Sequence, residues 1–131
     1  MLQMAKEVIS TQNAPGAVGP YSQAIKAGDF LFASGQIPIN PEKGRIVAST
    51  VADQTEQSMK NVGAILEAAG LSFDDVVKTT VYIVNMEYFG AVNEVYGKYF
   101  QKTLPARSCV EISKLPKDAL VEVEVVAYCG K

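Results

Sequence analysis

Arg107 is the residue whose context best suits ligand binding. It follows Pro105 and Ala106 and opens a stretch that predicts a β-strand, so its backbone direction is fixed by the proline and the strand. A guanidinium held in this way suits bidentate capture of a carboxylate. The alternative is an arginine in a solvated ion pair at the surface, and its position by itself favours that alternative.

Glu122 and Glu124 alternate along the last predicted strand and share one of its faces, about 7 Å apart. Glycosidases use carboxylates at such separations, but two strand neighbours point the same way and would not flank one sugar bond. One interpretation is a polar outer face. The other interpretation is that the two glutamates are partly buried, because Val126 and Tyr128 continue the same face. Partial burial raises the pKa of a glutamate and lets it hold a proton for a water or a departing amine.

The sequence contains no histidine, so Ser-His-Asp and Cys-His catalysis within the chain are excluded. Its two cysteines, Cys109 and Cys129, fit no CxxC spacing and are too few for a zinc cluster. Arg107 could lower the pKa of the Cys109 thiol, but a structural or lining role is favoured over a nucleophile. We expect neither a metal nor an organic cofactor.

Two glycine-containing segments, residues 19–23 (GPYSQ) and 34–36 (SGQ), are either simple turns or places where a ligand approaches the backbone. Neither matches a phosphate-binding loop or a dinucleotide fingerprint.

The composition predicts one ordinary globular domain over residues 1–131, with 48% hydrophobic and 20% charged residues. A net charge of −2 argues against a protein that coats nucleic acid. The N-terminal residues lack the apolar core of a signal peptide, and no stretch approaches the roughly 20 apolar residues of a membrane span. We therefore expect a cytoplasmic protein with free cysteines and no membrane partner.

Periodicity predicts strands and two helices. Alternating or β-branched runs indicate strands at residues 29–34, 76–84, 107–113 and 120–128. One helix is expected between a cap at Thr50 and Gly70, and a second after Asn85. This order is typical of an α/β or α+β sheet with helices on one face.

The strands are apolar on both faces. Val77, Val81 and Ile83 are expected to oppose Val76, Tyr82 and Val84, and residues 120–128 show the same two-sided pattern. Two helices can cover only one face, so a second copy of the chain is the simplest cover for the other. We expect a homo-oligomer, with room for a pocket at the subunit boundary.

Several blocks together resemble the Rid family of reactive intermediate deaminases, once called YjgF-type proteins or translation inhibitors. The blocks run in order along nearly the whole chain: residues 19–24 (GPYSQA), 34–38 (SGQIP), 92–96 (VNEVY), 105–111 (PARSCVE), 115–117 (LPK) and 121–124 (VEVE). The resemblance implies an α+β fold similar to bacterial chorismate mutase, with a single-layer mixed sheet packed by two helices on one face. It also implies a homotrimer with three clefts between subunits.

The resemblance further implies a role for each matching position. Arg107 would bind the substrate carboxylate, and Glu122 would hold or protonate a water. Backbone groups of Gly35 and Cys109 would contact the substrate, and three side chains would line the cleft: Tyr21, Ser34 and Asn93.

The implied reaction is hydrolysis of short-lived enamine and imine acids to 2-keto acids and ammonia, as by a 2-iminobutanoate/2-iminopropanoate deaminase acting on 2-aminoacrylate or its imine. Two alternatives stay open. One is a translation-inhibiting endoribonuclease, against which the acidic charge balance weighs. The other is a non-catalytic regulator that binds a ligand or a protein partner through the same cleft.

Overall fold

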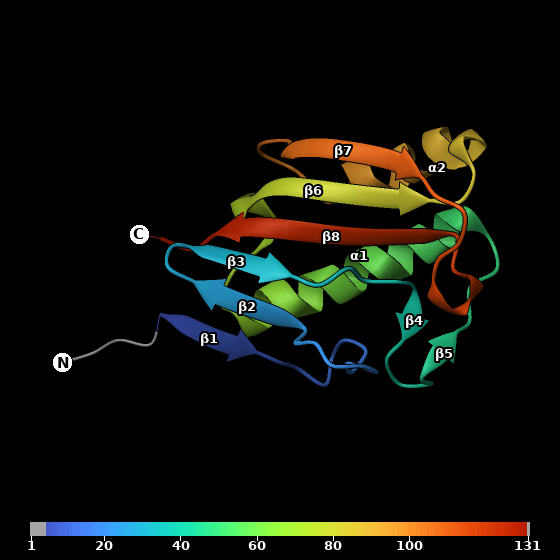
Figure 1. The fold of residues 1–131 in the computed structure, drawn as a ribbon. Helices are drawn as coiled ribbons and strands as arrows, with labels where there is room; N and C mark the ends of the chain where they lie inside the picture. Colours follow the sequence, from blue (N-terminus) through green and yellow to red (C-terminus); the bar gives the residue numbers. More distant parts are fainter. Residues whose placement is uncertain (1–4, 131) are drawn as a thin grey trace.

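A computed structural model describes residues 5–130, in which six strands form one sheet (Figure 1). The strands follow the order β1-β2-β3-β8-β6-β7, and all neighbours are antiparallel except β6 and β7. Their bounds are β1 Lys6–Ile9, β2 Ala24–Ala27, β3 Phe30–Ala33, β6 Val76–Ile83, β7 Ala106–Glu111 and β8 Val121–Tyr128. A separate short hairpin joins β4 (Ile39–Asn40) and β5 (Arg45–Ile46).

Two helices, α1 (Val51–Ala68) and α2 (Phe89–Gly97), lie together behind the sheet in Figure 1. The Thr50 hydroxyl accepts a hydrogen bond from the Asp53 amide at the start of α1 (3.1 Å), which is an N-cap. Gly70 follows the helix with φ of +76°, the left-handed conformation that glycine tolerates. The α+β class and the two helices on one face are confirmed.

The core lies between the helices and the sheet. Alternate residues of β8, namely Val121, Val123 and Val125, are buried against fully buried side chains of α1 such as Met59 and Ile65. The alternation places the intervening residues of β8 on the opposite, helix-free face of the sheet.

The helix-free face carries large exposed apolar side chains. Phe32 is 50% exposed and Tyr128 is 44% exposed, and the rings of Phe30 and Tyr128 pack edge to face at 5.5 Å. Val110 on β7 is also exposed. The expected apolar second face is therefore present, and its cover by a second copy of the chain stays a prediction.

Val77 does not share the face of Val81 and Ile83, so that expectation is wrong. The register between β6 and β8 shifts between Val76 and Lys78, which is a β-bulge. The extra residue reverses the alternation, so Val76 is buried and Val77 is 43% exposed.

Several segments differ from the expected elements. Strands β1 and β2 were not predicted, since each has four residues and includes charged side chains. The short hairpin of β4 and β5 was not predicted either, since each of its strands has only two residues. Asn85 caps a 3₁₀ turn, η2 (Met86–Tyr88), which leads directly into α2.

Candidate active site

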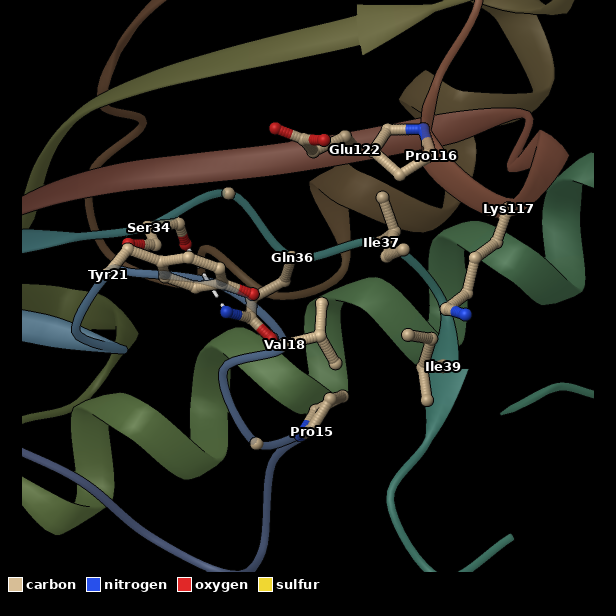
Figure 2. Close-up of a pocket in the computed structure, with 12 residues that line it drawn as sticks. Pro15, Val18, Tyr21, Ser34, Gln36, Ile37, Ile39, Pro116, Lys117 and Glu122 are labelled. Carbon is tan, nitrogen blue, oxygen red and sulfur yellow. Dashed lines mark hydrogen bonds between the residues drawn. The ribbon is translucent and has the colours of Figure 1, made fainter. Parts of the chain in front are cut away.

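Four of the expected site residues line one cavity of about 310 Å³ (Figure 2). Ser34 and Gly35 follow β3, Glu122 lies on β8, and Tyr21 comes from the loop before β2. Figure 2 shows Tyr21 and Ser34 on one side of the cavity and Glu122 above it. The structure therefore brings together residues that lie about 100 positions apart in the sequence.

The Glu122 side chain lies directly against the backbone of Gly35. A Cβ atom at Gly35 would come within 2.6 Å of Glu122 Cδ and closer still to Oε2. Only glycine permits this approach, because any larger residue would displace the carboxyl group.

Burial raises the pKa of the half-buried Glu122 carboxyl, and the negative charge of Glu124 raises it further. Glu124 itself accepts a hydrogen bond from the Tyr82 hydroxyl (2.9 Å). The expectation of a partly covered carboxyl with a raised pKa is confirmed for Glu122. Such a group can hold a proton closer to neutral pH than an exposed glutamate does.

Gln23 fixes one wall of the cavity, a role that the sequence did not indicate. Its buried amide donates to the carbonyls of Thr11 (3.1 Å) and Pro15 (2.7 Å), and its oxygen accepts from the Thr11 amide (2.7 Å). Beside it, the Ser34 hydroxyl donates to the Ser22 carbonyl (2.7 Å). The irregular loop before β2 is therefore held by side chains in place of a strand ladder.

Polar side chains of α1 fix the opposite wall. Buried Asn61 donates to the carbonyls of Ile37 (3.2 Å) and Ile39 (2.9 Å). Buried Gln54 accepts a hydrogen bond from the amide of Leu120, just before β8 (2.9 Å). The signal in the sequence is the presence of polar residues at helical spacing within an apolar face, where a buried polar group requires a partner.

Arg107 lies outside this cavity and packs against α2. It donates from Nη1 to Asn93 Oδ1 (2.6 Å), and its guanidinium carbon lies 5.0 Å from the Tyr96 ring centre and 5.3 Å from that of Phe89. Within residues 5–130, no carboxylate lies within 4.0 Å of it. The arginine is thus positioned by an amide and two aromatic faces, and the solvated ion pair is not observed.

Cys109 follows on the same face of β7 and packs against the core. Burial raises the pKa of its thiol, while the nearby charge of Arg107 opposes this rise. Because the thiolate is the reactive form of cysteine, this environment disfavours a nucleophile at Cys109 and favours a lining role.

The expected site residues therefore form two half-sites on opposite faces of the sheet. Arg107 pairs in register with buried Thr79, whose hydroxyl is hydrogen-bonded to that of Tyr96 on α2, so Arg107 points toward the helices. Glu122 alternates with buried core residues and points to the helix-free face. A ligand in the Glu122 cavity cannot reach Arg107 of the same chain through the packed sheet.

Residues 11–129 match the family described as Endoribonuclease L-PSP. The chain belongs to this family, which is the Rid family that the sequence motifs indicated.

Relatives match along nearly their full length. A RutC family protein of Pyrococcus horikoshii is 58% identical over 94% of this chain and 98% of its own. The 2-iminobutanoate/2-iminopropanoate deaminase of Mus musculus is 45% identical over 99% of this chain and 96% of its own.

Solved structures share the fold closely. A Rid family protein from Yersinia pestis has a TM-score of 0.92 at 54% identity, and E. coli TdcF with bound serine has a TM-score of 0.90 at 46% identity. Each match covers 95% of this chain and 99% of the other.

None of the helices described between residues 5 and 130 is long and apolar enough to cross a membrane. In the same range, no group of three or more histidine, cysteine or acidic side chains is placed to hold a metal ion.

Proposed function

We propose that the protein hydrolyses 2-imino and 2-enamino acids, such as 2-iminobutanoate, 2-iminopropanoate and 2-aminoacrylate, to 2-keto acids and ammonia. The observation that carries the proposal is the Glu122 carboxyl, which lies on a cavity wall against Gly35 with its pKa raised by burial. Relatives from mouse and human that are 45% identical bear the name 2-iminobutanoate/2-iminopropanoate deaminase, which supports the same reaction.

Arg107 binds the substrate carboxylate in this proposal. Its contact with Asn93 uses one donor of the guanidinium, and the aromatic faces of α2 orient the rest of the group. A guanidinium has five N–H donors, so a bidentate pair stays available for a carboxylate. Fixing this anion holds the imine carbon in a defined position, which converts an encounter into an oriented complex.

Glu122 donates and accepts the protons of the reaction in this proposal. Its protonated carboxyl donates to the imine nitrogen, and the resulting carboxylate then takes a proton from a water that adds to the carbon. The carbinolamine collapses as Glu122 returns that proton to the nitrogen and the C–N bond breaks. The hydroxyl proton passes to the Glu122 carboxylate, so ammonia and the 2-keto acid are released and the carboxyl is protonated again. An enamine substrate first takes a proton at its terminal carbon and loses one from its nitrogen to become the imine. The reaction consumes one water and needs no oxidant or cofactor.

The remaining expected residues shape the site. The Cys109 carbonyl accepts a hydrogen bond from the substrate amine, so the thiol is dispensable. Tyr21, Ser34 and the backbone of Gly35 line the cleft around the reacting carbon.

The complete site forms between copies of the chain, in a homotrimer with three clefts. Support comes from the position of Arg107 and Glu122 on opposite faces, which a single chain cannot bring to one ligand. The exposed apolar side chains of the helix-free face, Phe32 among them, give a second copy a surface to bury.

The test couples the protein to a serine or threonine dehydratase that releases 2-aminoacrylate or its four-carbon homologue, and follows the appearance of the keto acid. We expect Arg107→Ala to abolish the acceleration while the oligomer stays intact, and Cys109→Ala to retain most of it. An Arg107→Ala protein as fast as the parent would overturn the mechanism.

The family description also names an endoribonuclease, which is the alternative from a different class. The net charge of −2 does not favour a groove for single-stranded RNA. Incubation of the same preparation with a labelled single-stranded RNA separates the two, since cleavage without imine hydrolysis would replace our proposal with the nuclease.

A further inference from the structure

Lys117 and Asp118 form a strained turn, η3 (Pro116–Asp118), immediately before β8. Their φ angles are 58° and 57°, and both residues carry side chains. The left-handed conformation places Cβ close to the backbone, so it is costly for residues other than glycine. Strain of this kind persists where the surroundings hold it and is concentrated at ligand sites.

The Lys117 side chain lines the same cavity as Glu122. Figure 2 shows its ammonium group beside Ile39, on the side of the cavity away from Tyr21 and Ser34. Lys117 and Glu122 thus belong to different parts of one cavity wall.

The Lys117 ammonium has no carboxylate within 4.0 Å among residues 5–130. The nearest acidic residue in sequence, Asp118, instead pairs with Lys114 at 3.8 Å. Lys117 is itself an exposed residue, and Ile39 lies beside its ammonium group. The apolar residues Val18 and Ile37 also line the cavity. An exposed ammonium without a partner from the described chain keeps its three donors available for an anionic ligand group.

We propose that Lys117 binds an anionic group at the far end of the substrate side chain, so that the site favours imines of dicarboxylic amino acids. The proposal rests on the function proposed above and names the substrate class. The C=N carbon would lie near Glu122, methylene groups would pass Val18 and Ile37, and the terminal carboxylate would reach Lys117. A cavity of about 310 Å³ is at the small end of ligand sites, which suits a short acid.

The test compares two imines made in situ: 2-iminoglutarate from glutamate with an L-glutamate oxidase, and 2-iminobutanoate from threonine with a dehydratase. Residual imine is trapped with semicarbazide to give kcat/KM for each. The variant is Lys117→Met, which keeps an unbranched side chain one atom shorter and removes its charge. We expect the ratio of kcat/KM for iminoglutarate over iminobutanoate to fall about tenfold, as for loss of a charge-assisted hydrogen bond.

Lys60→Met is the matched control, since Lys60 is an exposed lysine of α1 that does not line this cavity. It should leave the ratio unchanged. An unchanged ratio of the two kcat/KM values in Lys117→Met overturns the inference. This includes the case in which kcat/KM falls equally for both imines, because the lysine then attracts any anion. Hydrolysis of iminobutanoate without iminoglutarate likewise overturns it while leaving the proposed function intact.

A binding measurement keeps the inference testable if neither imine is hydrolysed, which would refute the proposed function. The stable keto acids 2-oxoglutarate and 2-oxobutanoate are titrated by calorimetry. We expect tighter binding of 2-oxoglutarate to the parent protein and loss of that preference in Lys117→Met. Equal affinity of the parent for the two acids would overturn the inference.

Discussion

Gly35→Ala tests the contact on which the proposed chemistry depends. The new Cβ would lie 2.6 Å from Glu122 Cδ, whereas ordinary contacts begin at 3.4 Å, so the carboxyl carbon must retreat by about 0.8 Å. Misplacing a catalytic group by 1 Å can cost about 100-fold in rate. We therefore expect kcat/KM for imine hydrolysis to fall between about 10-fold and about 100-fold.

The fold should survive this substitution, because the displaced atoms are the end of a flexible side chain. We expect a loss of stability below about 1.5 kcal/mol, measured as the change in midpoint of urea unfolding. Gly16→Ala is the matched control: Gly16 lines the same cavity, but a Cβ there would meet nothing within 4 Å. It should retain parental activity and stability.

A double-mutant cycle identifies the cause of the loss. In a Glu122→Ala background the clash is gone, so Gly35→Ala should cost little further stability in urea unfolding. The contact with Glu122 is not the cause if Gly35→Ala is as active as the parent, or if its cost in stability is the same with and without the Glu122 carboxyl.

Three further substitutions probe the two half-sites. Asn93→Ala should raise KM about tenfold in the coupled assay with the oligomer intact by gel filtration, since it frees the guanidinium of Arg107. Because folding raises the pKa of Glu122, the folded state binds this proton more tightly, and stability falls as the pH rises from 4.5 through the folded-state pKa. Thermal melts should accordingly show Glu122→Gln raising Tm at pH 8 more than at pH 4, and an equal shift at both would contradict the burial argument. Asn61→Ala leaves two carbonyls of the cavity wall without their donor, so urea unfolding should reveal a loss of about 1–3 kcal/mol.

The regular parts of the fold were predictable because they follow from local patterns. The alternation in β8 placed Glu122 opposite the buried valines, and Thr50 and Gly70 marked the ends of α1 correctly. The bulge at Val77 was not predictable, since it depends on the register with β8 and not on the β-branched run that contains it.

The side chains that hold the cavity walls could not be predicted from the sequence for a different reason. Gln23 and Asn61 act through carbonyls as far as 12 and 24 positions away in the sequence, so their partners become visible only after folding. The separation of Arg107 from Glu122 likewise depends on strand pairing. Strand β6 lies between β7, with which it pairs in parallel, and β8, with which it pairs antiparallel. Motifs indicated the candidate site residues, and only the sheet register revealed that one chain keeps Arg107 and Glu122 apart.

In the proposed assembly, Arg107 of one copy and Glu122 of another act on the same substrate, and subunit complementation measures whether they do. Arg107→Ala and Glu122→Ala proteins, each inactive, are unfolded together, refolded as mixed oligomers and assayed for imine hydrolysis. Random mixing in equal amounts should restore about a quarter of parental activity, because each cleft then draws both intact residues in about one case in four. Mixed oligomers that stay as inactive as the separate variants would rule out a cleft shared between copies.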